Sequence, residues 1–180
     1  VVTQDIDNVQ GISDKNSGAF SSRELTGSTI QTINVKVQGT NDLPIVSSNN
    51  ASVTFHEGAD HVLLITDAQF SDIDNSTFTG GSIDVEIENA NDGDNLKVFD
   101  NSYLNVDGSN IKNTSDLVLG QISRSNINKD SQDVTKISIT LTEHASAFDV
   151  TSILRSIGYK NNLENISENN LTYKISVQDG

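Results

Sequence analysis

Residues 37–44, VQGTNDLP, are the stretch from which the fold can be worked out. The segment 29–38, which runs into it, alternates apolar and polar side chains, and this period of two is the pattern of a half-buried strand. Residues 39–42 are turn formers, and Pro44, the only proline, precedes a new apolar run. A turn that carries oxygen ligands between two strands is typical of a calcium-stiffened junction between tandem β domains. We therefore interpret the chain as part of a repeated extracellular rod.

Composition limits the classes of function. The chain has 180 residues, which suits one domain or slightly more, and it holds 11 Lys and Arg against 25 Asp and Glu. The net charge of −14 argues against nucleic acid and anionic membrane surfaces as partners, and it favours bound cations. No apolar run approaches the length of a membrane span, so no membrane insertion is expected. The absence of cysteine excludes disulfides and Cys nucleophiles, so stability has to come from the core or from a metal.

The rest of the chain reads as short strands separated by turns. Residues 1–28 are polar and contain several glycines, and they predict a long loop. The segment 143–159 has the apolar spacing of one short helix. The predicted strands are residues 29–38, 45–46, 53–55, 62–65, 83–87, 96–98, 137–141 and 171–177, with weaker ones within 103–123. Many short strands and a single helix predict an all-β antiparallel sandwich.

Four blocks of sequence occur in order along the chain. They are the linker GTNDLP at 39–44, FHEG at 55–58, FSDID at 70–74 with GSIDV at 81–85, and ILRSIGYKN at 153–161 with ISVQDG at 175–180. Together they resemble the cadherin-like and immunoglobulin-like tandem repeats of giant bacterial surface adhesins, the type I-secreted proteins that often carry RTX repeats. The resemblance implies an immunoglobulin-like or cadherin-like sandwich over residues 44–180. It implies that residues 1–43 are the polar loop, last strand and linker of a preceding or strand-exchanged repeat.

The order of the blocks suggests one repeat cut at a permuted point, with Gly180 followed in the parent protein by something like Val1. The sandwich 44–180 would then lack its final strand and would expose an unpaired edge. We expect residues 29–38 to fill this place in a neighbouring repeat or a second chain, as in β-strand addition. This expectation fails if residues 29–38 share a sheet with 171–177 of their own molecule.

Calcium takes oxygen ligands from carboxylates, Asn amides and backbone carbonyls. Candidate ligands recur at the linker, in the loop after residue 71 and after the last predicted strand; they are Asn41, Asp42, Asp72, Asp74 and Asp179. The resemblance implies that these five meet at one end of the sandwich. It places Glu57 at the opposite end, where a site is completed only when a next repeat follows. The alternative is that Asp72, Asp74 and Asn75 only cap a turn, and for the acidic turn 91–94 a hairpin turn is favoured over a cation loop.

These features predict a non-enzymatic structural repeat that extends a cell-surface adhesin or an extracellular filament on a bacterial surface, with Ca²⁺ fixing the angle between neighbours. The expected partners are similar repeats and a surface glycan or protein receptor. Two other functions stay open at this stage. A sugar- or peptide-binding module would use a concave patch around Tyr103. A hydrolase would have to use Glu143, His144 and Asp149, although the chain contains no GxSxG nucleophile motif.

Overall fold

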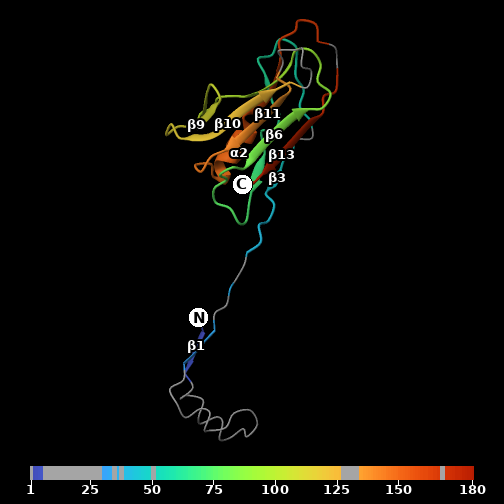
Figure 1. Ribbon diagram of the computed structural model, residues 1–180. Coiled ribbons are helices and arrows are strands. Elements are labelled where there is room, and N and C mark those ends of the chain that lie inside the picture. Colours follow the sequence, from blue (N-terminus) through green and yellow to red (C-terminus); the bar gives the residue numbers. More distant parts are fainter. Residues whose placement is uncertain are drawn as a thin grey trace. The chain divides into compact units, whose positions relative to one another are not determined.

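The computed structural model describes residues 2–5, 30–33, 36, 39–49, 52–126, 134–166 and 169–180. The chain divides into two compact units, Val1–Thr40 and Asn41–Gly180, and each is described separately. All strand pairs in the described part of both units are antiparallel. Figure 1 shows the course of the chain.

The described part of the first unit is a pair of strands, β1 (Val2–Asp5) and β2 (Ile30–Ile33). The prediction of a loop over residues 1–28 is therefore wrong at β1. The β-branched residues at the start of β1 favour an extended backbone, and a partner distant in sequence completes the ladder. The predicted strand 29–38 is observed over β2, whereas Lys36 belongs to no strand. The other residues of these two predicted segments lie outside the described part.

The second unit is built on a six-stranded sheet in the order β13-β6-β11-β10-β9-β8. In Figure 1, β13, β6, β11, β10 and β9 follow one another side by side. The bounds are β6 Ser82–Ile87, β8 Leu104–Asp107, β9 Asn110–Asn113, β10 Val118–Ser125, β11 Lys136–Leu141 and β13 Tyr173–Gln178. The alternation in β6 is as predicted: Ile83, Val85 and Ile87 are fully buried, and the residues between them are only half-buried.

Smaller sheets close the other side of the core. β12 (Ile157–Asn161) pairs with β4 (Val62–Leu63) on one edge and with β7 (Asp94–Val98) on the other. A further pair joins β3 (Ile45–Ser47) to β5 (Gln69–Ser71). One cluster of buried apolar side chains draws on the large sheet, on β12 and on the helix. The expected all-β antiparallel sandwich with one short helix is therefore confirmed.

The helix α2 spans Ala147–Arg155 and is shorter than the predicted 143–159. It begins where a capping box allows it: the Ser146 hydroxyl accepts a hydrogen bond from Asp149 N, and the Asp149 carboxylate accepts one from Ser146 N at 2.8 Å. The predicted C-terminal end is wrong because Ile157 is already the first residue of β12. The spacing of apolar residues after Arg155 is compatible with a helix or a strand, and pairing with β7 makes this segment a strand.

Residues 52–57 are a second departure from prediction. Val53 and Phe55 are half-buried against the core and alternate with exposed neighbours, so the segment has the period of a strand. Among the described strands, however, none pairs with it, and the first strand of this unit is β3. The predicted strand 53–55 is thus an extended segment without a ladder.

The Asp67 side chain holds the residues after β3 in place by hydrogen bonds, and its contribution to stability should depend on pH. Its carboxylate accepts hydrogen bonds from Ser48 Oγ at 2.6 Å and from Asn49 N at 2.8 Å, and these two contacts, in that order, lower the pKa of Asp67. A lowered pKa contributes stability above the unfolded value of about 3.9, and this contribution is lost as the pH falls through the lower folded pKa. Urea unfolding should therefore show Asp67→Asn to be less stable than wild type at pH 7, with the difference shrinking at pH 2. An equal difference at both pH values would contradict this assignment.

Candidate functional site

The topology of the second unit brings the linker, one loop and the end of the last strand together. Because β3 and β5 are antiparallel, with Ile45 opposite Ser71, the residues before β3 lie beside the loop that follows β5. That loop leads into β6, whose first residue Ser82 lies opposite Gln178 at the end of β13. Asp179 therefore follows β13 at the same end of the sandwich.

The first set of contacts joins the linker to the end of β13. Asn41 Nδ2 donates a hydrogen bond to Asp179 Oδ2 at 2.5 Å. Asn75 Nδ2 donates to the same carboxylate oxygen at 3.1 Å and to Asn41 Oδ1 at 3.2 Å. Three segments that are far apart in the sequence thus share one polar cluster.

The second set of contacts joins the linker to the loop. Asp42 N donates to Asp74 Oδ2 at 2.6 Å, so the bond that connects Asp42 to this group is made by its backbone. Asp72 Oδ1 accepts from the backbone N–H groups of Asp74 and Asn75 at 2.9 and 2.8 Å, as in an Asx turn. Asp72 Oδ1 therefore caps a turn, as the alternative prediction for this loop expects.

The other oxygen of Asp72 is not accounted for by the turn. Asp72 Oδ2 is buried and has no hydrogen-bond donor among the described residues. A buried carboxylate oxygen without a partner is costly, because it has lost its water and gained nothing in return. The loop therefore carries an acceptor that is suited to a further ligand.

The negative charge of this cluster also favours a bound cation. It contains the carboxylates of Asp72, Asp74 and Asp179, and a fourth acidic residue, Asp42, joins it through its backbone N–H. In the described part of the chain, none of the four forms an ion pair with a Lys or Arg side chain. Among the described residues, no group of three or more His, Asp or Glu side chains lies close enough together to hold a metal ion. The cluster is thus strongly anionic, but its amide-to-carboxylate hydrogen bonds occupy oxygens that a cation would use.

Asn75 is the member of this cluster that was not among the predicted ligands. Its side chain bridges Asn41 and Asp179, and so ties the linker to the last strand. In the sequence, the feature that points to Asn75 as a site residue is its position directly after Asp72-Ile73-Asp74. An Asn in that position suits turn formation equally well, so its contact with Asp179 could not be inferred from the sequence.

Glu57 lies apart from the cluster. Its Oε2 accepts a hydrogen bond from Ile166 N at 3.3 Å, in the loop that precedes β13, whereas Asp179 follows β13. This carboxylate therefore belongs to a different part of the second unit. Its predicted role in a second cation site stays a prediction.

No known protein family, curated protein or solved structure matches this chain. Its function must therefore be argued from the residues themselves. Among the helices that the structure describes, none is both long and apolar enough to cross a lipid bilayer.

The acidic turn 91–94 is organised by bonds within the protein. The buried carboxylate of Asp94 accepts from Asn91 N at 2.7 Å through Oδ2, and from the Tyr159 hydroxyl and Asn161 Nδ2 through Oδ1. These bonds make Asp94 the acceptor around which the β7 end of the turn folds. Burial, followed by the bond to Asp94, raises the pKa of Tyr159 well above its ordinary value, which keeps its hydroxyl a donor.

The region around Tyr103, predicted as an alternative sugar site, is held by internal contacts. The Tyr103 hydroxyl donates to Asp149 Oδ1 at 2.5 Å, and its ring meets Phe148 edge-on with centroids 5.1 Å apart. Burial and the bond to Asp149 raise the pKa of this hydroxyl. Asp149 is in turn the acceptor of the helix cap, so both polar groups are already engaged in the fold.

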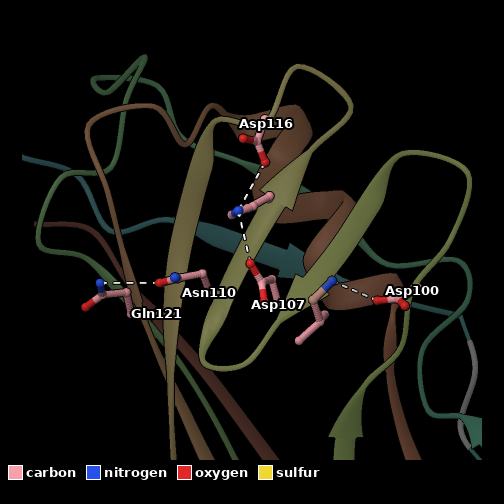
Figure 2. A network of polar contacts seen from close by, with 7 residues as sticks. Asp100, Asp107, Asn110, Asp116 and Gln121 are labelled. Carbon is pink, nitrogen blue, oxygen red and sulfur yellow. Dashed lines mark hydrogen bonds and ion pairs between the residues drawn. The ribbon is translucent and has the colours of Figure 1, made fainter.

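The neighbouring hairpin β8–β9 carries a polar network of a different kind (Figure 2). Lys112 Nζ lies 3.1 Å from Asp116 and 3.2 Å from Asp107, and both carboxylates are largely exposed. These carboxylates, Asp116 first, raise the pKa of Lys112. Asp100 accepts from Val106 N at 2.7 Å and fixes the chain as it enters the hairpin. Exposed pairs of this kind contribute little to stability, and the single charge of Lys112 balances only one of its two carboxylate partners.

Proposed function

We propose that this protein is a structural β-sandwich unit of an extracellular adhesin or filament, and that Ca²⁺ binds where its linker meets the sandwich. The observation that carries the proposal is the junction of Asn41-Asp42 with the Asp72–Asn75 loop and Asp179, in which Asp72 Oδ2 is buried without a donor. The bacterial surface as its location, and similar repeats or a surface receptor as partners, belong to the same proposal. Its role is mechanical rather than catalytic.

The chemistry of the donors favours calcium over softer metals. The cluster offers only carboxylate, amide and backbone oxygens, which are the ligands of hard cations. Asp72 Oδ2 and Asp179 would supply charge, and Asn41 and Asn75 would turn their amide oxygens towards the ion in place of the hydrogen bonds that they donate to Asp179. A cation would thus replace bonds between neighbours by bonds to one centre, and would leave the Asx turn at Asp72 Oδ1 intact.

Such an ion would determine how stiff the junction is. The linker is joined to the sandwich by short polar bonds, of which the bond from Asn41 to Asp179 and the bond from Asp42 to Asp74 are the anchors. A calcium ion that took several of its six to eight oxygen ligands from both the linker and the sandwich would hold them more firmly than separate exposed hydrogen bonds in water. A chain of such units would then be extended in calcium and flexible without it, which suits a spacer that projects from a cell.

Calorimetric titration with CaCl₂ tests the site directly. We expect saturable binding by the wild type, and an affinity at least about tenfold weaker for Asp72→Asn. This substitution removes the negative charge at the buried Asp72 Oδ2 and keeps the Oδ1 acceptor of the turn. Asp107→Asn is the matched control, because it removes one carboxylate from an exposed hairpin that already contains Lys112. Equal affinities of all three proteins, or no binding by the wild type, would overturn the proposed site.

A further inference from the structure

Among the described strands, β13 is an edge strand of the large sheet. It pairs with β6 from Tyr173 to Gln178, and no described strand lies on its other edge; Figure 1 shows it at the margin of the sheet. It contains no proline and no bulge in its register with β6, which are two devices that usually protect an edge. Its inward side chains, Tyr173, Ile175 and Val177, are half-buried, whereas those of β6 are fully buried. Among the described residues, no strand covers this edge.

A groove lies beside the first half of β13, where it is lined by Tyr173 and Ile175, and residues 52–57 line it as well. Its cavity measures about 1410 Å³, and it reaches down to Leu64 and Tyr159 of the core. Small-molecule sites usually occupy about 300–1,000 Å³, so this groove suits a peptide. Two of its lining segments, β13 and residues 52–57, have the period-two alternation of strands, and no described strand pairs with either of them on the groove side.

We propose that this groove binds residues 29–38 of a second copy of the chain as an added β-strand. The segment TIQTINVKVQ presents Ile33, Val35 and Val37 on one face, which matches the apolar floor of the groove. In a chain of net charge −14, this segment has one Lys and no acid. The groove lining also contains three acidic residues, Glu57, Asp92 and Asp94. The alternation of the segment fits the groove, and its lack of acidic side chains avoids repulsion from these carboxylates.

The donor has to come from another molecule. Every described strand pair is antiparallel, so the donor should end beside Tyr173, the first residue of β13. Asn41 is hydrogen-bonded to Asp179, which follows the last residue of β13. For a strand of six residues, this end lies about 17 Å from Tyr173 at the start of the strand. Gln38 is three residues before Asn41, and three residues span at most about 11 Å. The segment of the same chain cannot reach the required end, and head-to-tail exchange between copies follows.

The pairing of β2 with β1 does not prevent this exchange. β1 occupies one edge of β2, and no described strand pairs with the opposite edge, which is the edge that β13 of a neighbour would take. The proposal goes beyond the calcium site, since it rests on the edge of β13 and on the groove. Of the polar cluster it uses only the contact between Asn41 and Asp179, which fixes where the linker meets the sandwich. It therefore has to hold with calcium and with chelator alike.

Light scattering after size-exclusion chromatography, with CaCl₂ and with EDTA, tests the exchange. The wild type should exceed the mass of one chain, 19.4 kDa, by whole multiples that increase with concentration. Val35→Asp, which places a charge on the apolar face of the donor outside the sandwich, should return the protein to 19.4 kDa. Asn34→Asp is the matched control, because it adds the same charge on the polar face, and it should assemble as the wild type does.

A labelled peptide of residues 29–38 completes the experiment. It should bind monomeric Val35→Asp protein at one peptide per chain, and a peptide with Asp at position 35 should not. Equal masses for the wild type and Val35→Asp would overturn the exchange. Failure of the peptide to bind would overturn the groove as a strand site. A monomeric wild type that still binds the peptide would overturn the second copy as the occupant.

Discussion

Replacing Phe78 with Ala should lower the free energy of unfolding by about 3–5 kcal/mol, the usual cost of emptying a buried aromatic position. Phe78 is 1 % exposed, and its ring meets Phe70 edge-on with centroids 5.0 Å apart. Its N–H donates to Ala145 O at 3.1 Å, just before the helix. The residue therefore anchors the loop after β5 to the core, and urea unfolding measures the loss.

The same substitution should weaken calcium binding at the proposed site, because Phe78 holds the loop that carries Asp72 and Asp74. Phe148→Ala is the control: this Phe is 63 % exposed, and its removal should cost less than about 1 kcal/mol. Phe78→Leu should fall between the two, because it leaves a smaller cavity. If Phe78→Ala and Phe148→Ala cost the same, Phe78 does not anchor the loop.

Calcium should raise the melting temperature of the protein, and chelation should reverse the effect. A ligand at 100 times its Kd stabilises the folded state by about 2.7 kcal/mol, which for a domain of this size corresponds to about 5–10 °C. Differential scanning fluorimetry in CaCl₂ and in EDTA measures the shift. Mg²⁺ at equal concentration should produce a smaller one, because it requires six ligands in strict octahedral geometry and releases its water reluctantly.

Asp72→Asn separates this linkage from a general effect of salt. The variant should melt at nearly the same temperature in CaCl₂ and in EDTA, while Asp107→Asn should retain the wild-type shift. A wild type whose melting temperature is the same in both buffers would contradict the stabilising role of calcium. A shift of equal size in all three proteins would assign the effect to ionic strength.

Several elements could be predicted from local pattern alone. The alternation of Ile83, Val85 and Ile87 predicts β6 and its buried face, and that of residues 137–141 predicts β11. The helix was predicted too long at both ends. Apolar spacing continues past Arg155, and only the ladder of Ile157 with Val98 shows that a strand has begun. A periodicity reports which face is buried, and it does not report which partner buries it.

The candidate site, like the fold, could be predicted only in part from the sequence. The ligand chemistry of Asn41, Asp42, Asp72, Asp74 and Asp179 could be identified in the sequence, and the structure brings these residues into two linked sets of bonds at one end of the sandwich. The contribution of Asn75 and the buried oxygen of Asp72 could not be identified. Both depend on contacts across more than 30 positions of the chain or on local packing, which a residue type does not encode.

By itself, then, the sequence determined that the protein is all-β, that it does without disulfides, and that oxygen ligands stand at its turns, because alternation and composition are local properties. Only the tertiary structure decided which strands are neighbours, where the five polar residues meet and that no described strand pairs with the second edge of β13. These features arise from pairings between distant segments, and each pairing is selected by the packing of the whole sandwich around one core.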